Sequence, residues 1–287
     1  MGRVKDITKL LRIRQWVKNG FVFAGLVFSG LLASPEAWKM TIAAFGAFCA
    51  ASSAVYVLND SLDRRKDALH PVKKDRPIAS GRVKLPLAAL LTAVLLAVAL
   101  ALPLLVGSMS LLYCIAGYFV LMLAYSLYLK RIVIIDVMVI AAGFLIRAVA
   151  GVVVLDVSIS EWLILCTALL ALFLALNKRR GEIEKFGSDG STRGVLRKYS
   201  LNSLADMLNI ITPSIVVCYA LYTFNSPAGA RMMLTLPFVI YGLFRYIYIA
   251  DRKAFHDAPE EALLKDIPLL VCVALWAICS ALIMTLY

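Results

Sequence analysis

Three oxygen-bearing side chains recur at regular spacing directly after a long apolar run. Asn59, Asp63 and Asp67 stand at i, i+4 and i+8, so on a helix they project from one face. Oxygen ligands suit Mg²⁺, which keeps several waters and takes one or two carboxylates together with substrate phosphates. Mn²⁺ accepts the same ligands. A solvated helix end, whose acids pair with the cations at 64–66, has the same spacing, so the spacing alone leaves both interpretations open.

A second segment places cations directly after these acids. Residues 70–81, HPVKKDRPIASG, contain two prolines and a glycine, which predict an extended, turned loop. This loop brings Lys73, Lys74 and Arg76 close to the acidic face. Metal ligands beside cations for phosphate oxygens are the combination that a metal-bound diphosphate requires. The alternative is a loop that its charges hold at lipid headgroups, but the two motifs in succession favour the diphosphate site.

Charged residues also follow or interrupt later apolar runs. Lys178, Arg179 and Glu182 follow the sixth run and are candidates for substrate phosphates, although anchoring to lipid headgroups explains such a cluster equally well. Arg147 lies deep within a run, where an ionisable side chain usually faces a protein interior or a wet cavity. Asp136 lies near the end of its run, so an interfacial position explains it.

The remaining candidates lie where other runs begin or end. Lys18 and Asn19 follow Trp16, which we expect at headgroup level, and Tyr128 and Lys130 end the fourth run. We predict that these four residues, with Asp60 beside the first motif, line the mouth of one substrate site.

Composition places all of these residues in a membrane protein. The chain has 287 residues, of which 62% are hydrophobic and only 17% charged, and its mean hydropathy is +0.85. A soluble domain is about half apolar and about a quarter charged, and several uncharged runs here exceed the roughly 20 residues that cross a bilayer. The composition therefore excludes a soluble protein and a disordered one.

The apolar runs predict helices, because they are continuously apolar, whereas the strands of a membrane barrel alternate. We expect an all-α fold of about nine transmembrane helices in a single domain, residues 1–287, with the loops at about 59–85, 178–206 and 251–266 forming the mouth of the site. The predicted spans are 16–33, 40–58, 86–106, 109–128, 132–155, 161–177, 207–224, 232–250 and 267–286.

The net charge of +12 is distributed unevenly about these spans. If each span crosses once, only Lys39 and Arg231 lie on one side, and most of the other basic residues lie on the opposite side, in the segments 1–18, 59–85, 130–131, 178–206 and 251–266. The positive-inside tendency then predicts a cytoplasmic N-terminus, cytoplasmic active-site loops and an outer C-terminus. Charge confined to segments that flank the membrane argues against nucleic acid as the partner.

The segment NDSLDRRKDALHPVKKDRPIASG at 59–81 resembles the UbiA-type membrane prenyltransferase superfamily. The resemblance implies nine helices around a cytoplasmic-facing cavity. Within the superfamily, the chain is most similar to the branch that uses phosphoribosyl diphosphate. The motifs behind this narrower resemblance extend over the full length: RxxQWVKN at Arg12–Asn19, YSLYLKR at Tyr125–Arg131, IRAVAG at Ile146–Gly151, NKRRGEI at Asn177–Ile183 and APEEALLKD at Ala258–Asp266.

The resemblance implies a Mg²⁺-dependent transfer of 5-phosphoribose to a polyprenyl (decaprenyl-type) phosphate, with release of diphosphate. The reaction would take place at the plasma (inner) membrane and feed arabinose-donor synthesis for the cell envelope. A homo-oligomer is compatible with the resemblance. In the implied roles, the metal is held by Asn59, Asp63 and Asp67, with Asp60 nearby. The leaving diphosphate is neutralised by Lys74 and Arg76. The 5-phosphate or the acceptor phosphate is bound by Lys18, Lys178 and Arg179, and Arg147 lies in the cavity.

One departure from the superfamily pattern bears on the donor. Typical members that use prenyl diphosphates carry a second aspartate-rich motif between the sixth and seventh helices, whereas this chain has KRRGEIE at 178–184. A cation-rich loop suits a donor with an additional phosphate. An enzyme that joins an isoprenoid diphosphate to an aromatic acceptor remains an alternative, and so does a lipid transporter, although the inverted repeats expected of a transporter are not evident.

Overall fold

The computed structural model describes residues 2–286, apart from 71, 159, 187–193, 227, 252–262 and 264. The fold of these residues is all-α, as predicted, and nine α-helices in the described part of the chain have seven or more residues. They are α1 (Gly2–Leu11), α3 (Pro35–Leu62), α5 (Leu85–Leu105), α6 (Met109–Leu127), α7 (Ile135–Val153), α8 (Glu161–Phe186), α9 (Leu201–Asn225), α10 (Leu236–Asp251) and α12 (Ile267–Leu286).

Shorter helical segments connect these long helices. They are the 3₁₀ segments η1 (Ile13–Val22), η2 (Lys73–Asp75), η3 (Leu129–Arg131), η4 (Leu196–Lys198) and η5 (Gly229–Thr235) and the short α-helices α2 (Phe23–Phe28) and α4 (Arg64–Ala68). Seven helices in the described ranges are long and apolar enough to cross a membrane: α3, α5, α6, α7, α9, α10 together with η5, and α12.

Eight of the nine predicted spans coincide with long helices, but the first does not. The segment predicted at 16–33 forms the 3₁₀ segment η1, the six-residue helix α2 and a turn.

Serine side chains help to define where other helices begin: Ser34 accepts a hydrogen bond from the backbone N–H of Ala37, and Ser200 forms a capping box with Ser203.

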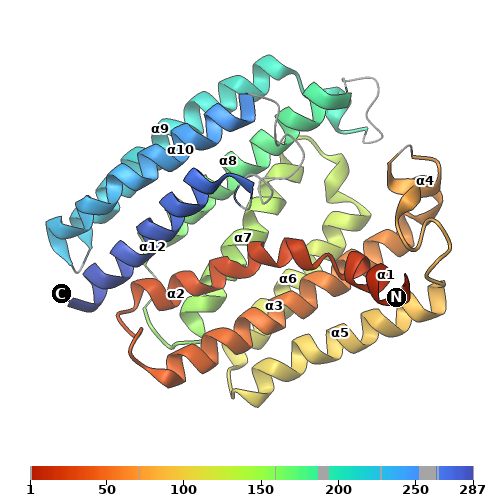
Figure 1. The fold of residues 1–287 in the computed structure, drawn as a ribbon, viewed down its shortest axis with the longest axis horizontal. Helices are drawn as coiled ribbons and strands as arrows, with labels where there is room; N and C mark the ends of the chain where they lie inside the picture. The colour runs from red at the N-terminus through yellow and green to blue at the C-terminus, as the bar shows by residue number, and fades with distance from the viewer. Residues whose placement is uncertain are drawn as a thin grey trace.

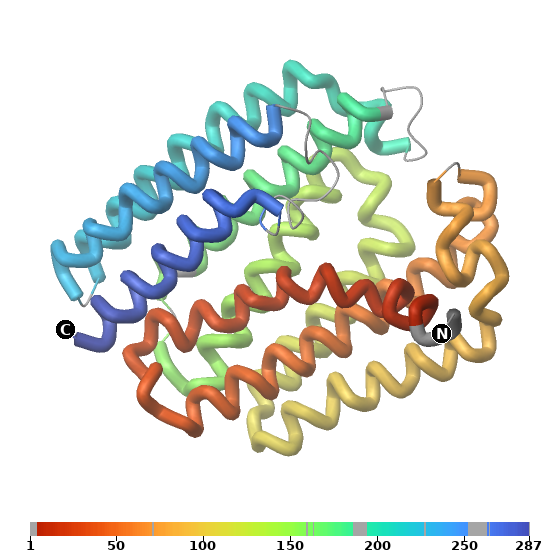
Figure 2. Tube along the Cα trace, in the orientation of Figure 1, coloured from red at the N-terminus to blue at the C-terminus, as the bar shows by residue number. Residues whose placement is uncertain are grey.

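The long helices form a bundle in which the two ends of the chain lie far apart (Figure 1). Helices α1 and α4 are both at one end, and the last turn of α12 lies at the other end, near the turn between α2 and α3. The tube view shows that η1 and α2 run across the face of the bundle and continue the path of α1 (Figure 2). Two clusters of buried apolar side chains stabilise the bundle, one centred on α8 and α9 with Phe173 and Leu204 and the other on α3 and α6 with Phe48 and Ile115.

The N-terminal segment packs against α7 with almost no space between the two backbones. A Cβ atom added at Gly151 would lie 1.8 Å from the carbonyl oxygen of Val22, and one added at Gly25 would lie 2.2 Å from the carbonyl oxygen of Gly151. Only glycine at both positions permits this approach. The IRAVAG motif therefore includes a residue that holds η1 and α2 against the core.

Replacing Gly151 with Ala is expected to destabilise the protein by about 1–3 kcal/mol, because the added methyl group meets backbone that cannot rotate away. Gly117→Ala in α6 is the matched control, since nothing lies within 4 Å of a Cβ added there. Thermal unfolding of both variants in mild detergent measures the difference. Equal midpoints would contradict the close approach of η1 to α7.

Candidate active site

The oxygen-bearing residues lie where α3 ends and α4 begins. Helix α3 ends at Leu62, but the backbone N–H of Asp63 still donates to Asn59 O at 2.9 Å and that of Asp67 to Asp63 O at 2.8 Å, so the α-helical spacing continues. On an uninterrupted α-helix Asp60 and Asp67 would project only about 20° apart, and although the helix is interrupted at Asp63, Arg76 contacts both acids. Asp60 and Asp67 are buried and form the inner pair of this acidic face, whereas Asn59 and Asp63 are half-buried and form the outer pair.

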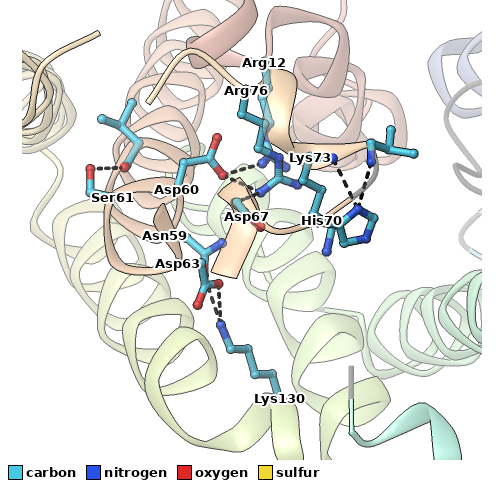
Figure 3. A network of polar contacts seen from close by, with 12 residues as sticks. Arg12, Asn59, Asp60, Ser61, Asp63, Asp67, His70, Lys73, Arg76 and Lys130 are labelled. Carbon is cyan, nitrogen blue, oxygen red and sulfur yellow. Dashed lines mark hydrogen bonds and ion pairs between the residues drawn. The ribbon is translucent and has the colours of Figure 1, made fainter. Parts of the chain in front are cut away.

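Two arginines from different segments converge on the inner pair of acids. Asp60 Oδ1 accepts from Arg12 Nη2 at 2.7 Å and from Arg76 Nη1 at 2.9 Å, and Arg76 Nη1 also lies 2.7 Å from Asp67 Oδ2. Both carboxylates are buried, with Asp60 3% and Asp67 5% exposed. Figure 3 shows Asp60 and Asp67 turned toward these guanidinium groups. The predicted proximity of Arg76 to the acidic face is therefore present in the fold.

The outer pair of acid and amide faces a lysine from a third segment. Lys130 in η3 places its Nζ 2.8 Å from Asp63 Oδ2 and 3.4 Å from Asn59 Oδ1, as Figure 3 also shows. The predicted face is thus divided between two sets of cations: Arg12 and Arg76 for the inner pair, and Lys130 for the outer pair.

The donor set fits a partly hydrated cation. In the described part of the chain, no three His, Cys, Asp or Glu side chains are grouped as a metal site, so a cage built only from such side chains is not present there. Asn59, Asp63 and Asp67 instead offer one amide and two carboxylates. The ion pairs engage the Oδ2 atom of each carboxylate, and each has a second oxygen. Mg²⁺ takes such a set, because it retains waters and binds substrate phosphates directly.

The loop after the acids is shaped by His70. Its Nδ1 accepts hydrogen bonds from the backbone N–H groups of Val72 at 3.0 Å and Lys73 at 3.3 Å. Burial, together with the positive charge of Lys73, lowers the pKa of His70 below its usual range, so the imidazole is neutral at pH 7 and remains an acceptor. Lys74, from the same loop, is exposed.

Replacing Arg76 with Gln is expected to disturb this site more than Arg12→Gln. Arg76 pairs with both Asp60 and Asp67, whereas Arg12 pairs with Asp60 alone of these two acids, so losing Arg76 removes the cation paired with the buried Asp67. Leaving a buried charged group without its partner costs about 2 kcal/mol or more. Thermal midpoints of the two variants test this order, and a larger loss for Arg12→Gln would contradict it.

The guanidinium of Arg179 is buried and bound by other side chains, whereas the predicted phosphate-binding role requires it to be accessible to a substrate. Its side chain is 1% exposed, and its guanidinium donates to Asp136 Oδ2 at 2.7 Å, Glu182 Oε2 at 2.6 Å and Tyr125 Oη at 3.1 Å. Asp136 lies in the first turn of α7, near the end of its span, but its side chain is not open to solvent: it is 0% exposed, because α8 and Tyr199 cover it. Sequence reasoning missed this ion pair because its partners lie 43 residues apart.

Arg147 and Asn19 are also buried and paired with each other. Arg147 Nε donates to Asn19 Oδ1 at 2.7 Å, Nη1 to Gly143 O at 2.7 Å and Nη2 to Tyr118 Oη at 2.9 Å. Asn19 is 0% and Arg147 5% exposed. The protein interior expected around Arg147 is present, but the position expected for Asn19 at the mouth of the site is not, since its side chain faces α3 and α7.

A cavity of about 550 Å³ lies between η1, α2, α7, α8, α9, α10 and α12. Lys18 and Lys178 are among its lining residues, and most of the rest are apolar. At one end, Phe28 packs edge-on against Tyr222 and Trp276, and Trp162 joins the same cluster. The lysines lie toward the other end: along α8, Lys178 is 16 residues, or about 24 Å, from Trp162.

Apart from Lys73, Lys74 and Tyr128, the predicted site residues separate into three groups. Asn59, Asp60, Asp63, Asp67, Arg76 and Lys130 converge, Lys18 and Lys178 line the cavity, and Asn19, Arg147, Arg179 and Glu182 belong to buried or half-buried polar networks. Tyr128 is 67% exposed and does not line the cavity. Much of the predicted loop at 251–266 and part of 178–206 lie outside the described residues.

A model of the UbiA prenyltransferase family matches residues 20–265. The chain belongs to this family. It is accordingly a UbiA-family transferase and a multi-pass integral membrane protein, as the apolar spans predict. The resemblance at 59–81 is confirmed. In this UbiA chain, that segment supplies the acidic face and one of its cations, Arg76.

Two curated relatives of this UbiA chain carry the same name. It is 32% identical to "Decaprenyl-phosphate phosphoribosyltransferase" of Mycolicibacterium smegmatis, over 95% of this chain and 90% of the relative, and 32% identical to the protein of that name in Corynebacterium glutamicum, over 97% and 86%. Its fold is similar to that of a UbiA homologue from Archaeoglobus fulgidus bound to GPP and Mg²⁺, with a TM-score of 0.76 at 16% identity, over 98% of this chain and 99% of that one.

Proposed function

We propose that this chain transfers 5-phosphoribose from phosphoribosyl diphosphate to a polyprenyl phosphate and releases diphosphate. The observation that carries the proposal is the convergence of Arg12, Arg76 and Lys130 on one face of oxygen ligands, in a chain similar over nearly its full length to decaprenyl-phosphate phosphoribosyltransferases. Acids that bind a metal and cations that bind phosphate oxygens are both needed for a diphosphate donor.

The donor's diphosphate would bind at the acidic face. Asn59, Asp63 and Asp67 would hold Mg²⁺, which supplies positive charge to the diphosphate when it is bound. Arg76 and the exposed Lys74 would contact the oxygens of the leaving group, where negative charge develops. Lys130, which pairs with Asp63 in the structure, would offset the negative charge of that carboxylate.

The acceptor's isoprenoid chain would occupy the cavity, because the cavity is mainly apolar and extends along α8. Its phosphate would lie near Lys18 and Lys178. Arg179, which the sequence grouped with these lysines, would instead hold Glu182 and Asp136 in place.

The reaction needs no strong base. An oxygen of the acceptor phosphate, already anionic near neutral pH, forms the new bond to C1 of the ribose. The C1–O bond to the diphosphate breaks and the diphosphate leaves with the electron pair. Positive charge develops at C1 in the transition state, as in other glycosyl transfers.

The proposal includes the placement of the protein. We infer a single domain in the plasma (inner) membrane, with α1, α4 and the acidic face on the cytoplasmic side, because the basic segments gather at that end. Membrane lipids would surround the exposed apolar faces. A homo-oligomer is compatible with this arrangement.

Donor binding separates this proposal from the transfer of an isoprenoid diphosphate. In mild detergent, phosphoribosyl diphosphate with Mg²⁺ is expected to raise the thermal midpoint, because a ligand that binds only the folded state stabilises it. Geranyl diphosphate with Mg²⁺ is expected to raise it less. Asp67→Asn should abolish the shift and the exposed Asp206→Asn should retain it. A larger shift with geranyl diphosphate would favour the prenyltransferase alternative, which the mainly apolar cavity also fits.

A further inference from the structure

The N-terminal segment from Arg12 to Val22 contacts both halves of the proposed site. At its start, Arg12 Nη2 lies 2.7 Å from Asp60 Oδ1, on the acidic face. Six residues later, Lys18 lines the cavity. The segment therefore carries one residue that meets the proposed donor site and one that lines the proposed acceptor cavity.

This segment does not fix its own position. It is a ten-residue 3₁₀ segment, longer than the few residues over which this weakly hydrogen-bonded helix is usually found. Arg12, the residue directly before it, has a φ of 52°, in the left-handed region, which a non-glycine residue adopts only at a cost. Contacts from the rest of the bundle must therefore hold it in place.

One buried set of these contacts reaches Asn19, the residue next to Lys18. Asn19 Oδ1 accepts from Arg147 Nε at 2.7 Å, and Asn19 Nδ2 donates to Ser52 Oγ at 3.3 Å. Arg147 is itself held by Gly143 O and Tyr118 Oη, and its guanidinium lies 4.5 Å from the centre of the Tyr118 ring. Hydrogen bonds from a charged donor in such a buried place are among the stronger ones.

The geometry of a 3₁₀ helix links this contact to the cavity. With three residues per turn, adjacent side chains project about 120° apart. Asn19 is turned toward α3 and α7, while Lys18 faces the cavity. Because the contacts of Asn19 fix its orientation, they also fix the direction in which the side chain of Lys18 projects from the backbone.

We propose that Arg147 is a positioning residue that acts through Asn19 to hold Lys18 at the mouth of the acceptor cavity. This inference rests on the proposed function for its kinetic consequence, but not for its geometric one. Arg147 itself touches neither substrate. Its role differs from that of a purely structural arginine, because its loss should move one residue of the site as well as lower stability.

The kinetic test compares variants that disturb different sides of Arg147. Arg147→Met is expected to raise the KM for polyprenyl phosphate about tenfold or more, as expected for the loss of a charge-assisted hydrogen bond, while the KM for phosphoribosyl diphosphate stays within about twofold. Arg147→Lys should recover part of the loss. Tyr118→Phe removes one hydrogen bond to Arg147 but keeps the ring beside its guanidinium and its contacts with Gly143 and Asn19, so it should lower the thermal midpoint without changing the acceptor KM.

A distance measurement tests the geometry without relying on activity. Spin labels are placed at Lys18→Cys and Lys178→Cys in a background whose native cysteines are replaced with Ala, and pulsed electron paramagnetic resonance records the distance distribution. We expect a narrow distribution in the parent and with Tyr118→Phe, and a broad or shifted one with Arg147→Met. Arg147→Lys, which keeps the buried charge, serves as the second variant if Arg147→Met yields no folded protein.

The two measurements separate the possible failures. An unchanged distance distribution in the Arg147 variants would overturn the positioning role. So would a fall in the thermal midpoint accompanied by equal changes in both KM values. A distribution that broadens in a protein that transfers no phosphoribose would support the positioning role and overturn the proposed function.

Discussion

Replacing Asp67 with Asn is expected to lower kcat/KM for phosphoribosyl transfer by about 10²–10³-fold, the size of effect seen when one group that stabilises developing charge is removed. The change removes a carboxylate proposed to hold Mg²⁺ while keeping the shape of the side chain. The fold should survive, because Arg76 retains its ion pair with Asp60 at 2.9 Å. Rates measured at several Mg²⁺ concentrations check the prediction, since the variant should also need more metal.

Asp75→Asn is the matched control for this prediction. Asp75 lies in the same loop and is exposed, and the contacts that Lys9 and Arg82 make with it go to its backbone oxygen. Its carboxylate should be dispensable, so kcat/KM should stay within about twofold, as surface changes usually have small effects. Similar losses at positions 67 and 75 would contradict a specific role for Asp67, and so would full activity in Asp67→Asn.

Replacing Asp136 with Asn is expected to destabilise the protein by about 1–3 kcal/mol, the cost of leaving a buried polar group without its partner, since Arg179 keeps its second ion pair, with Glu182. Arg179 and Asp136 are 1% and 0% exposed, with Nε and Oδ2 2.7 Å apart. Arg179 donates to one oxygen of the Asp136 carboxylate and Tyr199 donates to the other. The amide of asparagine has a single oxygen, so one of these two donors would lose its acceptor. Unfolding in detergent, followed by circular dichroism, measures the loss.

Two further variants decide whether the pair itself is responsible. The exposed Asp206→Asn should change stability by no more than about 0.5 kcal/mol. The double variant Asp136→Leu, Arg179→Met should lose less than the sum of its single changes, because neither charge is then left unpaired. Additive losses would show that the two residues act independently, contrary to their contact in the structure.

Apolar runs were enough to predict most of the fold, because a helix that crosses a bilayer must be long and continuously apolar. The first segment was the exception. Its apolar composition resembles that of the other spans, but η1 and α2 are held by backbone contact between Val22 and Gly151. A contact between residues so far apart in the chain leaves no periodic signal in the local sequence.

The site could be predicted to the extent that it is local. Asn59, Asp63, Asp67 and Arg76 lie within one short segment, and helical spacing brings them together. Arg12 and Lys130 reach the same face from distant segments, 48 and 67 residues away from their acidic partners. For Arg147 and Arg179, the sequence showed that a charge lies in or beside a span but not whether it faces a substrate or another side chain.

The most direct test of the proposed function is transfer from labelled phosphoribosyl diphosphate to polyprenyl phosphate by the purified protein in lipid vesicles. We predict a lipid-soluble product that carries the labelled ribose phosphate, formed only with Mg²⁺ or Mn²⁺ and lost in the Asp63→Ala, Asp67→Ala double variant. Absence of that product with the intact, folded protein, under conditions in which an isoprenoid diphosphate is transferred to an aromatic acceptor, would contradict it.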